Sequence, residues 1–558
     1  MRRHPGGRLA AASLAALLAG CADFAPKYHA PIVAVPASYK ETGEWQKGDP
    51  EDSLPRGPWW SIYHEALLDK LEAQLNAANP DIAAAVAHYD SSRAFVSQIN
   101  STLFPSVGTG GAASQYGYNG VGNRPHGASV RGFNAPSQYA IQPSPGRNMG
   151  MFNQYEYNAA GGSVGYEIDL WNQLHDMVKN AEYQSQAAAA LLVSAQLSLQ
   201  AQLASDYMLL RGLDAEIDII ARAVKDYRDG VQITVNRYQG QIASGLEIAE
   251  AKTVLEQAQA QESDVRASRA LVEHAIASLV GQPASAFSIP PAVTAIVLPN
   301  IPTGLASDLL QRRPDVAAAE RQVAAANEEI GVTKAAFFPV LNLGLVGGGL
   351  AGGYGQSLIA SPLSYWAVGP QFLMPLFEGG YRRAAEAQAY ARLREAVANY
   401  RATVLGAFQE VEDDLSLLNN LGTEFQQVSE AVTDSARSLQ LSTSLFQEGG
   451  VNYLDVVVND IQWLDTQTSA IQVQTRRLQA NVDLVRALGG GWSMADLPGA
   501  TQTIMLDPLK PGTVSPKQVG PTPANYYQPA PNAAPPGASP GASPGAPPAA
   551  PAPPASSQ

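Results

Sequence analysis

The sequence predicts an α+β membrane protein in which one structural unit is present twice. Short motifs recur at a constant spacing: Asn79-Pro80-Asp81 recurs as Arg313-Pro314-Asp315, and Phe104-Pro105 recurs as Phe338-Pro339, both 234 positions later. Each half contains two segments that alternate like strands, followed by a proline-free stretch typical of a very long helix. Self-similarity of this kind indicates that each copy is one incomplete structural unit.

Two further matches extend the repeat along the chain. Leu170-Trp171 recurs as Leu376-Phe377 after 206 positions, and Tyr238, Leu246 and Glu247 recur as Phe446, Leu454 and Asp455 after 208. We therefore predict six segments: a signal peptide (1–20), an extended N-terminal segment (21–61), a first repeat (62–285), a linker (286–300), a second repeat (301–495) and a Pro/Ala/Gly-rich disordered tail (496–558).

The N-terminus has the pattern of a bacterial lipoprotein signal. Arg2, Arg3 and Arg8 precede an apolar run of 11 residues from Leu9 to Ala19, too short for a bilayer-spanning helix. The run ends in Leu18-Ala19-Gly20-Cys21, which resembles a lipobox, and Cys21 is the only cysteine of the chain. We predict lipidation, including palmitate, at Cys21. The alternative is an ordinary signal peptide with an incidental cysteine. In the lipoprotein sorting pattern that this segment resembles, aspartate directly after the cysteine favours retention in the inner membrane. Ala22 stands at this position instead, which is compatible with sorting to the outer membrane.

Charge and hydropathy restrict the classes of function. Removing the three arginines of the signal takes the formal net charge from −14 to −17, so the mature chain is a poor nucleic-acid binder. No run of 18 apolar residues follows the signal, which argues against a transmembrane helix; spanning a membrane would then require strands. The tail from Pro511 to Gln558 is too polar and proline-rich to bury a core, although a cell-wall or partner contact is an alternative role.

Two segments show the two-residue period of strands. In the first, Val164, Tyr166, Ile168 and Leu170 share one face while Glu167 and Asp169 share the other. In the second, Leu341, Leu343 and Leu345 face away from Asn342 and Gly344. In a transmembrane barrel the polar face lines the lumen, so Glu167, Asp169 and Asn342 are lumen candidates. Aromatic residues at the segment ends form candidate interfacial girdles: Phe104, Tyr166, Trp171, Phe337, Phe338, Tyr365, Trp366, Phe372 and Phe377. A half-buried soluble sheet would show the same alternation.

The number of strands requires oligomerisation. Two strands per repeat give four per chain, whereas a transmembrane barrel needs at least about eight. Open strand edges are not tolerated in lipid, so two or three chains must combine. The Gly/Asn/Tyr/Ser-rich segment from about Gly110 to Gly161 is predicted to be a long extracellular loop.

The helices predicted from the sequence are unusually long. Residues 172–238 and 382–447 contain no proline and would each span roughly 100 Å. Apolar residues of the second stretch are spaced as in a coiled coil: Val404, Phe408, Val411, Leu415, Leu418, Gly422, Phe425, Val428 and Val432. Turns at 239–245 and 448–453 lead into return helices at 247–281 and 453–488, and shorter helices at 81–103 and 315–337 precede the strands. We expect glycines to supply the positive φ values of the turns; the candidates are Gly240, Gly245, Gly449 and Gly450.

Several ordered motifs resemble the signature of the outer-membrane factors, the TolC-like efflux channels, and in particular the lipid-anchored NodT-type subgroup. They are Leu309–Val316, Ala319-Glu320, Ile330-Gly331, Ala336–Pro339, Phe446–Gly449 and Tyr453–Val456. The resemblance covers about residues 21–495. It implies a homotrimer with a 12-stranded β-barrel continuous with an α-helical periplasmic tunnel. It also implies docking to a periplasmic adaptor (membrane fusion) protein and to an inner-membrane pump, usually of the resistance–nodulation–division type.

The sequence departs from the family pattern at the helix tips. Gly240-Gln241 stands where relatives more often have the glycine one position later, and Val457, Val458 and Ile461 replace polar residues that close the tip in several relatives. Tip and gate candidates are therefore the four glycines together with Tyr453, Asp455, Val458, Asp460 and Ile461. An apolar constriction can gate by dewetting. Alternatively, these residues simply pack between helices.

We find no pattern that predicts catalysis, a cofactor or a metal site. The histidines are scattered, and Gly347-Gly348-Gly349, which we expect between strands, lacks the ending of a phosphate loop. The function predicted is an outer-membrane exit duct for small molecules in a multidrug-efflux system. Alternatives are a duct for secreted protein or polysaccharide, or a lipid-anchored coiled-coil scaffold without a pore.

Overall fold

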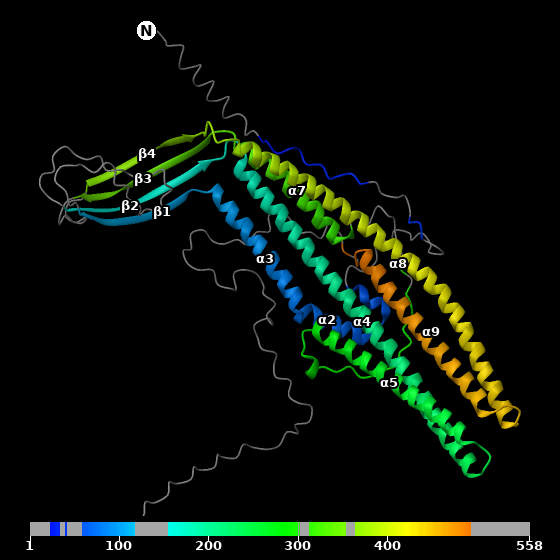
Figure 1. The fold of residues 1–558 in the computed structure, drawn as a ribbon. Helices are drawn as coiled ribbons and strands as arrows, with labels where there is room; N and C mark the ends of the chain where they lie inside the picture. The colour runs from blue at the N-terminus through cyan, green and yellow to red at the C-terminus, as the bar shows by residue number, and fades with distance from the viewer. Residues whose placement is uncertain are drawn as a thin grey trace, which may run out of the picture.

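The computed structural model describes residues 23–33, 39–41, 58–117, 154–299, 301, 312–352, 363–490 and 492. The predicted signal peptide, Cys21 and the Pro-rich tail lie outside these residues. Strands and helices occupy opposite ends of an elongated molecule, with the sheet at one end and two helical hairpins at the other (Figure 1).

The same order of elements occurs twice along the chain. Helix α3 (Pro80–Asn100), strands β1 (Ser106–Gly117) and β2 (Gln154–Ile168), and helices α4 (Gln173–Gln239) and α5 (Gly245–Leu279) form the first series. Helix α7 (Pro314–Ala335), strands β3 (Val340–Gly352) and β4 (Leu363–Leu373), and helices α8 (Tyr381–Gln447) and α9 (Tyr453–Ala487) form the second. Helix bounds agree with the predicted ranges to within about three residues, the scatter expected of helix ends.

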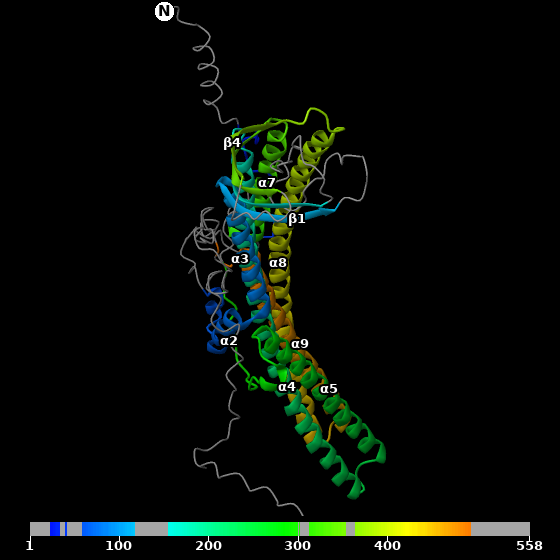
Figure 2. The same cartoon turned by 90° about the vertical axis from the view of Figure 1, so that its left-hand side faces the viewer.

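Helices of equal length stand at equivalent positions of the two series. Both α4 and α8 have 67 residues, and both α5 and α9 have 35. At about 1.5 Å per residue the long helices span roughly 100 Å. Helix α4 packs against α3, α5, α7 and α9, and α8 packs against α7 and α9. Each long helix is therefore flanked by two shorter ones in succession: α3 and α5 lie along α4, and α7 and α9 lie along α8 (Figure 2).

Recurring residues at the helix starts have local structural roles. Pro80 and Pro314 occupy the first turns of α3 and α7, where a missing N–H costs no hydrogen bond. The Asn79 side chain accepts hydrogen bonds from the backbone of Asp81 and Ile82, at 2.8 and 3.0 Å. Its counterpart Arg313 instead bridges Asp315 and Glu410, both at 2.7 Å, and so links α7 to α8. The motif that reveals the repeat thus defines how each helix begins.

The core lies where the short elements η1 (Trp59–Tyr63) and α2 (Ala66–Ala78) cover the long helices. Leu68, Tyr207, Leu415 and Leu484 are fully buried there. The first five residues of the predicted coiled-coil row, Val404 to Leu418, are buried in the same cluster. By length and composition alone, α4 is also apolar enough to cross a membrane, which counting apolar runs did not detect. Core helices share this composition, and 44% of the apolar window of α4 is buried within the described structure.

The strands of the described residues form one antiparallel sheet in the order β1-β2-β3-β4, in agreement with the predicted four strands. Two predictions on the strands are wrong. The segments 110–117 and 154–161 were expected in a loop but belong to β1 and β2, because the two strands pair from Ser106↔Gly165 out to Gly117↔Gln154. Gly347–Gly349 lies inside β3 rather than between strands. The rest of the predicted loop, 118–153, lies outside the described residues.

The strand register separates an apolar face from a face of small and polar residues. Val164, Leu345 and Val368 are neighbours on the apolar face, which confirms the predicted alternation. Val107, Trp366, Val368 and Phe372 are largely exposed on this face. Glu167, Asn342 and Gln371 are neighbours on the other face. An exposed apolar face on a sheet is what contact with lipid requires.

Candidate functional site: the helix tips and the junction with the sheet

The first helix tip joins α4 to α5 through an unexpected left-handed residue. Gln241 has φ 59°, whereas Gly240 has φ −78° and Gly245 opens α5. The prediction that glycine supplies the positive φ of this turn is therefore wrong. Hydrogen bonds from Gly240 N to Asn236 O and from Ile242 N to Arg237 O end α4 and require the left-handed step between them. Glycine one position later would have met this requirement without strain.

The second tip follows the expected chemistry. Gly449 has φ 79°, and Gly450 N donates to Leu445 O at 2.8 Å to end α8. Asn452 and Asp455 then form a capping box at the start of α9: Asp455 N donates to Asn452 Oδ1 at 3.0 Å, and Asn452 N donates to Asp455 Oδ2 at 3.2 Å. Asp455 therefore holds the helix start.

Ser244 and Glu247 form the equivalent capping box of α5. These two residues precede Asn452 and Asp455 by the same 208 positions that separate the other repeated residues of the tips. The recurrence of Glu247 and Asp455 in the sequence thus reflects a capping role.

Aromatic contacts fix the second tip against α4. The guanidinium of Arg237 lies 5.2 Å from the centre of the Phe446 ring, and the Phe446 and Tyr453 rings are 5.7 Å apart. Tyr453 Oη lies against Gly230, where a Cβ atom would collide with it. Tyr453, a predicted tip residue, therefore reaches α4 at a point where only glycine leaves room.

The apolar gate candidates differ in their surroundings. Val458 is 57% exposed, whereas Val457 is buried and Ile461 packs on the apolar cluster of Ile220, Val224 and Leu464. Asp460 is half-buried, and burial followed by the charge of Asp226 raises its pKa to about 6. Of the three apolar residues, Val458 alone is free to line an opening in this chain.

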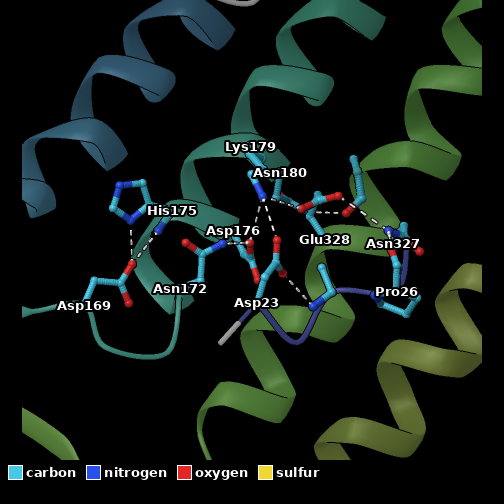
Figure 3. Close-up of polar contacts among 12 residues, drawn as sticks. Asp23, Pro26, Asp169, Asn172, His175, Asp176, Lys179, Asn180, Asn327 and Glu328 are labelled. Carbon is cyan, nitrogen blue, oxygen red and sulfur yellow. Dashed lines mark hydrogen bonds and ion pairs between the residues drawn. The ribbon is translucent and has the colours of Figure 1, made fainter. Parts of the chain in front are cut away.

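A second cluster lies where the helices meet the sheet, and it was not predicted. Lys179 of α4 forms ion pairs with Asp176 (3.3 Å), Asp23 (3.4 Å) and Glu328 (3.6 Å) (Figure 3). These carboxylates come from α4, the N-terminal segment and α7. Asn327 Nδ2 also donates to Pro26 O at 2.7 Å. The segment 23–28, here called the strap, is thereby tied to two helices.

Apolar contacts and a glycine complete the docking of the strap. The Phe24 ring stacks on Phe338 at 4.5 Å, and Phe338 stacks on Trp171 at 4.8 Å. A Cβ atom on Gly331 would lie 2.9 Å from Ala25 Cβ, so glycine is needed for this close approach. Further along the N-terminal segment, the carboxylate of Glu412 accepts hydrogen bonds from Lys40 N and Glu41 N.

The lumen candidates are separated by the structure. Glu167 and Asn342 are register partners on the polar face of the sheet. Asp169 lies beyond the end of β2, and its carboxylate bonds to His175 N (3.0 Å) and His175 Nδ1 (2.7 Å). The prediction that Asp169 shares a strand face with Glu167 is wrong, because β2 ends at Ile168. The interpretation of Leu170 as a strand residue fails for the same reason.

Tyr365 lies on the opposite face from the one that a girdle residue requires. It pairs with Gly348, which pairs with Gly161, and its face is that of Glu167 and Asn342. Cβ atoms built on Gly161 or Gly348 would each lie 2.9 Å from Tyr365 Oη. The ring therefore extends across two glycine-bearing strands, whereas its neighbour Trp366 belongs to the apolar face.

Comparisons with known proteins identify the family. The family model for outer membrane efflux proteins matches residues 71–282 and 305–490, so the chain belongs to that family. It is therefore an outer-membrane protein with an efflux function, its helices extending into the periplasm.

Particular relatives share most of their length with it. Pyoverdine export outer membrane protein OpmQ of Pseudomonas aeruginosa is 28% identical over 438 residues, covering 78% of this chain and 87% of OpmQ. Antibiotic efflux pump outer membrane protein ArpC of Pseudomonas putida is 27% identical over 489 residues, covering 87% and 95%. The CmeC outer membrane channel of Campylobacter jejuni has the same fold, with a TM-score of 0.73, 20% identity, and 85% and 96% coverage.

Proposed function

We propose that this protein is the passive exit duct of a three-part efflux system, acting as a homotrimer. Three copies of the four-stranded sheet close a 12-stranded barrel across the outer membrane, and the long helices continue it as a periplasmic tunnel. The chain performs no catalysis, and the partner pump supplies the energy. The segment boundaries given above, from the signal peptide at 1–20 to the tail at 496–558, describe its organisation.

One observation carries this proposal. The sheet has an exposed apolar face, a small and polar opposite face, and two outer strands, β1 and β4, whose free edges have no partner among the described strands. Unpaired N–H and C=O groups are not tolerated in lipid, so closure with other copies is required. The sheet also runs directly into helices of 67 residues, too long to be explained by a compact domain.

A lipid anchor at Cys21 fits the docking of the strap. Asp23 and Phe24 are held where the helices meet the sheet, which is the level of the membrane surface in a barrel of this kind. Cys21 precedes Asp23 by two residues, so an acyl chain attached there is within reach of the bilayer. The strap thus explains how an anchor could be combined with a sheet that crosses the membrane.

The partners and cargo follow from the relatives. OpmQ is named for pyoverdine export and ArpC for an antibiotic efflux pump. We infer that small molecules reach this duct from an inner-membrane pump, of the resistance–nodulation–division type, through a periplasmic adaptor that binds the helix tips. The tip residues that control opening are the turn glycines together with Tyr453, Asp455, Val458, Asp460 and Ile461, and Val458 is the one best placed to line the passage.

The test is single-channel recording of the purified protein in a planar bilayer, with its mass in detergent measured on the same preparation. Resolved conductance steps from a trimer are expected. A monomer that inserts into no bilayer would contradict the duct and favour a periplasmic scaffold instead.

A further inference from the structure

A row of polar side chains crosses the sheet close to its helical end. Glu167 of β2 is the register partner of Asn342 of β3, which is the partner of Gln371 of β4. Directly opposite residues of antiparallel strands lie on the same face, so these three side chains form one line. The line lies on the face opposite to Val164, Leu345 and Val368.

Between this row and Tyr365, the same face carries mainly glycine and other small residues. Its residues between this row and Tyr365 are Ser106, Gly108, Gly110, Gly161, Ser163, Gly165, Gly344, Val346, Gly348, Ala367 and Gly369. Tyr365 itself extends over Gly348 and Gly161. This stretch of the face therefore supplies few groups that could select between molecules.

Glu167 is the only charged residue on this face among the described strands. The neighbouring acidic residues outside the strands are paired: Asp169 bonds to His175, and Asp176 pairs with Lys179. Within the described part of the chain, Glu167 has no hydrogen bond or ion pair that would compensate its charge. The sheet therefore presents a single uncompensated carboxylate near its junction with the helices.

We propose that Glu167 is the charge-selecting residue of the duct. In the proposed trimer the three rows form one ring, in which three carboxylates alternate with amide side chains. A ring of carboxylates favours cations and disfavours anions in a pore. The duct would accordingly pass cationic and neutral molecules more readily than anionic ones. This inference rests on the proposed function, because without a closed pore the row selects nothing.

The experiment is the reversal potential of single channels under a KCl gradient, for the wild type, Glu167→Gln and Glu167→Lys. We expect a cation-selective wild type, a shift of the reversal potential toward zero in Glu167→Gln, and a reversal of its sign in Glu167→Lys. Asn342→Asp adds a carboxylate to the same row and is expected to increase cation selectivity. The Gln variant keeps the shape of the side chain, so the test does not depend on Glu167→Lys folding.

Asp218→Asn is the matched control, since it removes one carboxylate from the exposed surface of α4, where Asp218 pairs with Arg222 at 3.1 Å. Its reversal potential should equal that of the wild type. Normal conductance steps with an unchanged reversal potential in Glu167→Gln would overturn this inference alone, as would an equal shift in Asp218→Asn. Absence of conductance in the wild type would refute the duct itself.

Discussion

Gln241 has a left-handed backbone conformation, with φ 59°. The equivalent residue of the second tip is Gly449, with φ 79°. A residue with a Cβ atom adopts this conformation at a cost of about 1 kcal/mol relative to glycine. We expect Gln241→Gly to stabilise the first tip by about that amount, which corresponds to roughly fivefold slower amide exchange over the turn. Hydrogen exchange read by mass spectrometry measures this.

The control for this prediction is Gly240→Ala. Gly240 has φ −78°, and the nearest atoms to an added Cβ are 3.5 Å away, so no change from left-handed strain is expected. Gly449→Ala should have the opposite effect at the second tip. Equal exchange in Gln241→Gly and the wild type would mean that the turn relaxes in solution.

Glu72 is a buried acid that the sequence did not reveal. Its side chain is fully buried on α2, and neither carboxyl oxygen has a hydrogen-bond partner among the residues that the structure describes. Burial, and then the charge of Asp69, raise its pKa from 4.5 to about 9. The folded state therefore holds a proton that the unfolded state releases, so stability falls as the pH rises from about 4.5 to 9.

We expect Glu72→Met to be more stable than the wild type at pH 8 and to lose less stability as the pH rises. Met is of similar length and needs no hydrogen bond, so it removes the cost of burying a polar group without opening a large cavity. Melting temperatures at several pH values between 5 and 9 measure the effect. Parallel curves for the two proteins would show that Glu72 finds a charge partner in the assembled protein.

At the scale of single elements, Gly161 and Gly348 leave room for the Tyr365 side chain to lie over β2 and β3. Gly348→Ala would place a Cβ 2.9 Å from Tyr365 Oη and closer still to the backbone of β2. Displacing the ring exposes glycine-rich strands that have little side-chain packing of their own. We expect a lower melting temperature of the assembled protein, measured by heating in detergent before electrophoresis.

Gly369→Ala is the control on the same face, because no atom of the described part of the chain lies within 4 Å of the added Cβ. It should leave the melting temperature unchanged. Equal melting of Gly348→Ala and Gly369→Ala would show that Tyr365 does not cover the glycines in the assembled sheet.

The two apolar tip candidates should respond differently to an added charge. Val458 is exposed, so Val458→Asp is expected to raise conductance with little effect on stability. Ile461 packs on the cluster between α4, α5 and α9, so Ile461→Asp should destabilise the hairpins first. Planar-bilayer recording and melting curves of both variants separate the effects. Unchanged conductance in both would exclude an apolar gate at this level of the tip.

Helices were predicted more accurately than strands, for a physical reason. The bounds of α4 and α8 are set by prolines, turn residues and a long apolar period, all visible in the sequence. Residues 110–117 and 154–161 are rich in glycine, serine and asparagine and become strands only through pairing with each other. Sequence alternation cannot show pairing, so these segments were predicted as part of a loop. Tyr365 was predicted as a girdle residue together with the other aromatic residues at the segment ends, but it lies on the face of Glu167 and Asn342.

The candidate site was predicted only in outline. The sequence located both tips, but not that Asp455 caps α9, that Ile461 is packed, or that Gln241 makes the left-handed turn. These depend on local backbone geometry and on helices far apart in the chain. The ion pairs of Lys179 with Asp23 of the strap and with Glu328 of α7 join residues more than 140 positions apart, so no local motif predicts them.

At the scale of the whole molecule, the strap connects the N-terminus to the junction of sheet and helices independently of any lipid. The ion pair of Asp23 with Lys179 and the stacking of Phe24 do not involve Cys21. We therefore expect Cys21→Ser to abolish fatty-acid labelling while the purified trimer keeps its conductance. Labelling retained in Cys21→Ser would refute the anchor. Conductance lost together with labelling would show that the lipid, rather than the strap, positions the barrel.

The outer edges of β1 and β4, which have no partner among the described strands, have a genetic consequence. If three chains together close one barrel, a single chain with a defective sheet inactivates the whole trimer that contains it. In a cell making normal and edge-damaged chains in equal amounts, only about one trimer in eight would be free of damaged chains. Inactivating substitutions on the strand edges should therefore be dominant over the normal gene, whereas substitutions that prevent export of the chain should be recessive.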